Sequence, residues 1–230
     1  MLTAALFTLT AGCGEDDPDT TTSTTGSATA TSSSSTTTTS EPAAEQQPAI
    51  WPAAGVVFDT PEEAAQDFID KALGAGVLGD FQQGDSRSGE INVFSPGEGG
   101  SDAIVRGTLL LRQLGPDNGW FVIAAVNDNA TIDAPEAGTE VPAGPLTVAG
   151  KARGFEATVV LRAFAAGDAD TELDEVITSG GAMETPEPYS ESVDLTGALP
   201  GQVVTIIVQG GTGLATDPGE FGAIPVVIAG

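Results

Sequence analysis

The chain has 230 residues and a formal net charge of −26, because 33 acidic residues stand against only 7 basic ones. This surplus of negative charge argues against nucleic acid as a partner, since affinity for nucleic acid comes mostly from lysine and arginine neutralising phosphates. The apolar fraction of 40% is ordinary for a folded protein, so the composition predicts one or two packed domains.

Residues 1–13 have the pattern of a bacterial export leader. The run MLTAALFTLTAG is apolar but too short for a spanning helix, which needs about 20 residues, and it resembles the apolar core and cleavage end of a secretory signal. Leu9–Cys13 resembles the lipobox, in which small residues precede a cysteine that is lipidated and becomes the mature N-terminus. The resemblance implies a lipid on Cys13, the chain's one cysteine, and the extracytoplasmic face of the cell membrane. The alternative is a chance run of small residues with a free thiol.

Residues 14–55 are dominated by serine, threonine and acidic residues. The segment TTTSTTGSATATSSSSTTTTS has no apolar periodicity, so burial cannot offset the entropy lost on ordering it. We predict a disordered tether between the anchor and the folded part.

Residues 57–129 predict a small α+β module. Thr60-Pro61-Glu62-Glu63 is a capping box with proline at the first helical position, and apolar residues then recur at helical spacing, so we expect a helix over Pro61–Leu73. Strands are expected at Glu90–Phe94, Ile104–Leu114 and Trp120–Val126, with Val105, Leu109 and Leu111 as inward positions. Trp120 and Phe121 are open to a ligand-stacking or a core interpretation, and the core is favoured because neighbours on a strand point to opposite faces.

Residues 130–229 contain short apolar runs separated by Gly, Pro and Asp clusters. This spacing predicts an antiparallel β-sandwich. The expected strands are Thr131–Asp133, Leu146–Ala152, Ala157–Phe164, Glu172–Thr178, Ser190–Leu195, Val203–Gln209 and Ile224–Ile228.

Two runs within this region resemble a known family. Pro145–Ala152 reads PLTVAGKA and Phe155–Val159 reads FEATV, and both are similar to the signature of the Gmad2 domain, an immunoglobulin-like domain of bacterial spore-germination proteins. The final run IPVVI resembles the last strand of that family, so the similarity covers roughly residues 132–228. The resemblance implies an extracytoplasmic immunoglobulin-like sandwich, often in a lipoprotein, and it brings no catalytic residues.

Candidate site residues are few. Glu156 and Arg153 are weak ligand-binding candidates, although Glu156 is better explained by bonds to backbone N–H groups at a strand start or by pairing with Arg153 or Lys151. The acidic run Asp168–Glu175 resembles a calcium loop but has Leu173 where such loops have glycine, so a solvated hairpin is preferred to weak calcium binding. Without histidine, neither a Ser-His-Asp nor a Cys-His arrangement can form. We expect no catalytic residues, metal or cofactor.

These features predict a mainly β chain: an immunoglobulin-like sandwich preceded by a small α+β module and a disordered tether. The predicted function is a non-enzymatic, lipid-anchored binding or scaffold protein that presents its sandwich to a protein or wall component of the cell envelope. Contact with the membrane would be through the anchor alone. The alternative is an accessory or inhibitory subunit of a membrane protein or cell-wall enzyme.

Overall fold

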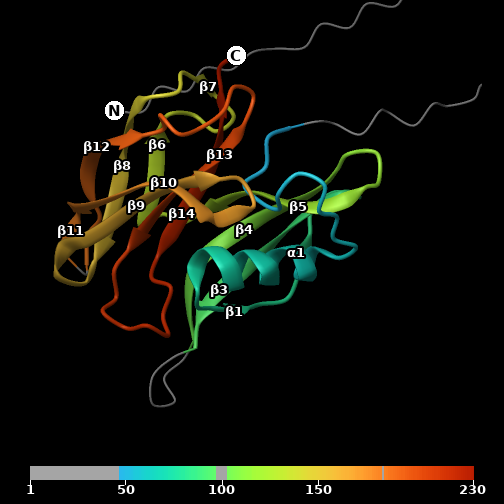
Figure 1. Ribbon diagram of the computed structural model, residues 1–230. Coiled ribbons are helices and arrows are strands. Elements are labelled where there is room, and N and C mark those ends of the chain that lie inside the picture. The colour runs from blue at the N-terminus through green and yellow to red at the C-terminus, as the bar shows by residue number, and fades with distance from the viewer. Residues whose placement is uncertain (1–46, 97–102, 183) are drawn as a thin grey trace, which may run out of the picture. The chain divides into compact units, whose positions relative to one another are not determined.

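Strands dominate the fold, as the alternating apolar patterns predict. The computed structural model describes residues 47–96, 103–182 and 184–230 (Figure 1). Its strands are β1 (Val77–Leu78), β2 (Gln82–Gln83), β3 (Ser88–Ser95), β4 (Ile104–Leu114), β5 (Gly119–Val126), β6 (Ala130–Ala134), β7 (Glu140–Val141), β8 (Pro145–Gly154), β9 (Thr158–Ala165), β10 (Asp168–Ser179), β11 (Gly181–Ala182), β12 (Glu187–Asp194), β13 (Val203–Gly210) and β14 (Phe221–Ile228). The predicted fold class, mainly β with antiparallel sheets, is confirmed.

The predicted helix is present and begins with the predicted capping box. In α1 (Pro61–Phe68) the Thr60 hydroxyl accepts from the Glu63 N–H, and the Glu63 carboxylate accepts from the Thr60 N–H, each at 3.3 Å. The helix continues as a π-helical turn, η1 (Ile69–Leu73), and ends at Gly74 in a left-handed conformation. The full helical span expected from the sequence is therefore confirmed.

Two sheets organise the described residues. The larger has the order β1-β3-β4-β5-β14-β13-β9-β10, with β2 beside β3 and β7 beside β14. The smaller has the order β11-β8-β12, with β6 beside β8. Because β14 pairs with β5 at Ala223 and Ala125, the last strand of the chain joins the two halves into one sheet. Helix α1 covers one face of β3, β4 and β5 (Figure 1).

The second half of the chain forms a sandwich with its own core. Strand β8 of the small sheet and strands β9 and β13 of the large sheet contribute the fully buried side chains of Val148, Leu161 and Ile206. A buried tyrosine, Tyr189 on β12, donates its hydroxyl to the Thr131 carbonyl at 2.8 Å. Burial raises the pKa of Tyr189 far above its usual range, so this hydroxyl stays protonated and remains a donor.

A second core lies on the outer face of the sandwich sheet. Phe164, Ile207 and Phe221 pack there against side chains of α1 and β3–β5. Strand β13 is therefore covered on both faces, which explains why its sequence is a nearly continuous apolar run. The predicted modules at 57–129 and 130–229 share this core and the larger sheet, so the boundary near residue 130 is not a separation in the structure.

The folded chain begins earlier than residue 55, where the tether was predicted to end. Ile50 and Trp51 are completely buried, and Trp51 forms an antiparallel bridge with Val122 of β5. The Trp51 indole N–H donates to Asp67 at 2.8 Å, and its ring packs edge-on against Phe68. Two apolar side chains therefore fix the end of a polar segment. The remainder of the predicted tether, up to residue 46, lies outside the described residues, as does the leader.

One of the three inward positions predicted for β4 is wrong. Leu109 and Leu111 are buried, but Val105 is 40% exposed. In the pairing with β3, Val93 lies opposite Gly107 and Phe94 lies opposite Val105, which leaves Arg106 as the extra residue of a β-bulge. The bulge shifts the alternation of side chains and turns Val105 outward. Trp120 is buried and packs edge-on against Phe81, as the core interpretation predicted.

Candidate functional site

Two loops at one end of the sandwich enclose a pocket of about 210 Å³. One loop joins β8 to β9 through a short 3-10 turn, η2 (Phe155–Ala157), and the other joins β13 to β14 over residues 211–220. The pocket is lined by Arg106, Arg153, Gly154, Phe155, Gly210, Gly211, Thr212, Leu214, Asp217 and Glu220. We call this end of the sandwich the loop end.

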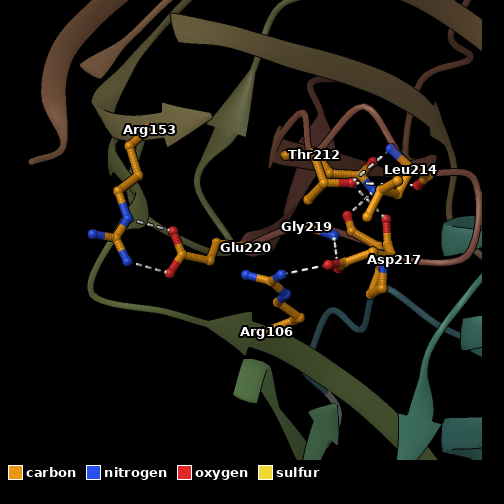
Figure 2. A network of polar contacts seen from close by, with 9 residues as sticks. Arg106, Arg153, Thr212, Leu214, Asp217, Gly219 and Glu220 are labelled. Carbon is orange, nitrogen blue, oxygen red and sulfur yellow. Dashed lines mark hydrogen bonds and ion pairs between the residues drawn. The ribbon is translucent and has the colours of Figure 1, made fainter. Parts of the chain in front are cut away.

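A bidentate ion pair forms one wall of the pocket. Arg153 Nε and Nη2 donate to the two carboxylate oxygens of Glu220, both at 2.7 Å, and Figure 2 shows this parallel arrangement. The Arg153 Nη1 also donates to the Glu184 carbonyl at 2.9 Å, and Asn129 donates to Glu220 at 2.9 Å. The Glu220 side chain is only 10% exposed, so these donors take the place of water around its carboxylate. The hydrogen bonds with Glu220 raise the pKa of Arg153.

A second ion pair, between Arg106 and Asp217, crosses from the first half of the chain to the loop end (Figure 2). Arg106 is the bulge residue of β4, so the irregularity in that strand directs its side chain here. Asp217 also accepts from the Gly219 N–H at 2.9 Å, which fixes the β13–β14 loop. The buried Arg106 Nε has no hydrogen-bond partner among the described atoms, whereas Nη2 is paired.

Apolar side chains occupy the rim of the pocket. Phe155 is 47% exposed and Leu214 is 41% exposed, one from each loop. Glu156 and Ala157, directly after Phe155, both have left-handed backbone conformations with φ of 52° and 60°. Such conformations are costly for residues other than glycine and persist where the surrounding structure fixes them. Phe155 therefore projects from a turn with a defined shape.

The structure separates the two predicted site residues. Arg153 lines the pocket, and its carboxylate partner is Glu220, whereas pairing with Arg153 was one of the explanations considered for Glu156. Glu156 is exposed on the turn. Sequence reasoning missed Arg106, Asp217 and Glu220. These carboxylates lie 111 and 67 residues from the arginines they bind, so no local spacing pointed to the pairs.

The loop end combines paired charges with an exposed apolar rim. Both guanidinium groups that line the pocket are matched by carboxylates, so the ion pairs fix the loops while the rim offers aromatic and aliphatic surface. Among the described residues, no cluster of three or more acidic, cysteine or histidine residues is arranged to hold a metal. The acidic run at 168–175 instead forms the first part of β10, directly after the turn at residues 166–167, and Asp168 accepts from Asp170 and Thr171. Cys13 lies outside the described residues.

The strand pairing defines the class of the domain. Strands β6, β8 and β12 pair in the order A-B-E of an immunoglobulin-like sandwich, and β9, β13 and β14 pair in the order C-F-G. The loop end is then formed by the B–C and F–G connections, two of the loops that carry the binding site in antibody variable domains. In the described part of the chain, no helix is both long enough and apolar enough to cross a bilayer.

Comparison with known families agrees with this class. Residues 129–209 match the family described as the immunoglobulin-like domain of bacterial spore germination, Gmad2, which confirms the resemblance seen in the sequence. The matched residues run from the start of β6 to nearly the end of β13, and the structure adds β14 to the same sandwich. Neither a curated protein nor a solved structure matched the chain.

Proposed function

We propose that this chain is a lipid-anchored, extracytoplasmic binding or scaffold protein that docks a cell-envelope partner on its loop end. The observation that carries the proposal is the pair of exposed apolar side chains, Phe155 and Leu214, at the rim of a pocket whose loops are held by two partly buried ion pairs. Aromatic side chains in fixed positions contribute much of the energy of protein interfaces, because they bury a large area at little entropic cost. The Gmad2 match and the resemblance of Leu9–Cys13 to a lipobox support an extracytoplasmic location.

The loop end is tested by a double substitution, Phe155→Ala with Leu214→Ala, in the full-length chain expressed in its own cells. We expect recovery of a crosslinked envelope protein to fall about tenfold or more, since loss of two central contacts costs at least about 1.4 kcal/mol of binding free energy. The matched control is Ile177→Ala with Leu199→Ala, because these side chains are 70% and 68% exposed and do not line the pocket. Equal recovery with both double variants would contradict docking on the loop end.

The anchor is tested independently with Cys13→Ser. We expect this variant to lose incorporation of a fatty-acid probe and to move from the membrane fraction to the soluble fraction. A thiol of the folded part cannot substitute, because Cys13 is the only cysteine. Retention of the label in the Cys13→Ser variant would contradict lipidation at this residue. If the recovered partner is an enzyme or transporter whose activity changes on binding, the chain acts as an accessory or inhibitory subunit.

A further inference from the structure

The segment at residues 47–54, here called the latch, lies between the two halves of the folded chain, residues 57–129 and residues 130–229. We call the region where these halves meet the junction. Toward β5, the Ile50 and Trp51 N–H groups donate to the Val122 carbonyl at 3.0 and 3.2 Å, and the Val122 N–H donates to the Trp51 carbonyl at 2.9 Å. Toward the sandwich, the Ile50 carbonyl accepts from the Gly167 N–H at 3.1 Å and from the Thr205 hydroxyl at 2.9 Å. Adjacent latch residues therefore bond to opposite sides of the junction.

The junction has direct contacts that do not involve the latch. Strands β5 and β14 share the register pair Ala125 and Ala223, and at the loop end Arg106 reaches Asp217. Near Val122 the latch takes the place that a longer β14 pairing would occupy. Thr205 is completely buried, so its hydroxyl would lose its acceptor if the Ile50 carbonyl moved away. The two ends of the junction are thus held by different means, one by the latch and one by the Arg106–Asp217 ion pair.

The packing along the latch is incomplete. A pocket of about 510 Å³ is lined by Gln47, Pro48 and Ala49 of the latch together with Phe121 of β5 and Val203 of β13. A Cβ added at Gly55 would have no atom within 4 Å, and Gly55 has a φ of 86° that glycine adopts without strain. Ile50 and Trp51 therefore anchor the latch. The pocket lies beside residues 47–49, and Gly55, whose backbone is free to change conformation, follows the latch directly.

We propose that the latch is a releasable element, which leaves the junction while the sandwich stays folded. Release opens the junction near Val122 and leaves the loop end held by Arg106–Asp217 and Asn129–Glu220. This conformational role is independent of whether the loop end binds a partner.

A glycine pair in the fold provides the test. Gly167 and Gly201 both have a φ of 77°, so alanine introduces the same backbone strain at each. A Cβ at Gly167 would overlap the backbone of Pro52 and Ala53 in the latch, whereas a Cβ at Gly201 has no atom within 4 Å. Gly167→Ala therefore displaces the latch, and Gly201→Ala is its matched control.

The readouts are hydrogen exchange and Trp51 fluorescence in a Trp120→Phe background, since Trp51 and Trp120 are the only tryptophans. With Gly167→Ala we expect at least tenfold faster exchange at the Val122 amide, a red shift of Trp51 emission and unchanged exchange in β13. Equal behaviour of both glycine variants, or equal loss of protection in β13, would overturn the proposal. The unsubstituted chain gives a check that does not depend on a variant folding. Its Val122 amide should lose protection from exchange at a lower denaturant concentration than the β13 amides do. Loss of protection at the same concentration would contradict a separable latch.

Discussion

Replacing Trp51 with alanine is expected to lower the free energy of unfolding by about 3–5 kcal/mol, the usual cost of removing a large buried aromatic side chain. Trp51 is completely buried, packs against Phe68 and donates to Asp67. The substitution leaves a cavity beside the helix and removes one donor from a carboxylate that still pairs with Lys71 at 2.8 Å. Urea denaturation of the chain measures the loss.

Leu199→Ala is the control for this prediction. Leu199 is 68% exposed, so its replacement should change stability by less than about 0.5 kcal/mol. A cost for Trp51→Ala no larger than that of Leu199→Ala would show that residues 50–51 are not part of the core. The same reasoning means that a chain beginning at Val57 lacks part of its own core, so preparations of the folded part should begin no later than residue 47.

Arg153→Ala is expected to destabilise the fold by about 2–4 kcal/mol, because it leaves the nearly buried Glu220 carboxylate with Asn129 as its remaining side-chain donor. Replacing both partners, with Arg153→Met and Glu220→Leu, should restore stability to within about 1 kcal/mol of the original chain. Paired apolar side chains carry no desolvated charge, which explains the recovery. Denaturation of the two single variants and the double variant forms a complete thermodynamic cycle.

The more exposed pair Lys71–Asp67 provides the comparison for the partly buried pair Arg153–Glu220. The Lys71 side chain is 61% exposed, so Lys71→Ala should cost less than about 1 kcal/mol. If Arg153→Ala cost no more than Lys71→Ala, the ion pair would not be what fixes the loop end. If the double variant Arg153→Met with Glu220→Leu were as unstable as Arg153→Ala, Arg153 and Glu220 would fill space that apolar side chains cannot fill.

Local patterns were sufficient for most elements. The capping box fixed the start of α1, and apolar runs, alternating in most strands and nearly continuous in β13, located every longer strand, because these signals depend on residues close in sequence. Strands of two residues, such as β1 and β7, are too short to show a period. Val105 was misplaced because nothing in the apolar pattern marks Arg106 as a bulge.

Features that depend on distant contacts were not accessible. The pairing of β5 with β14 brings together residues 125 and 223, and composition alone made the two halves look like separate modules. Ile50 and Trp51 were the one available signal for the latch, since they interrupt a polar segment with two large apolar side chains. At the loop end, Arg153 could be singled out from its neighbours in the Gmad2-like run, but its carboxylate partner could not.

The measurement that tests the central proposal most directly is site-specific photocrosslinking in intact cells, with a photoreactive amino acid in place of Phe155 and, separately, in place of Ile177. Both side chains are exposed, but only Phe155 lies at the loop end. Docking on the loop end predicts one envelope protein crosslinked from position 155 and none from position 177, with the product lost when Leu214→Ala is added. The same products from both positions, or none from position 155, would contradict it.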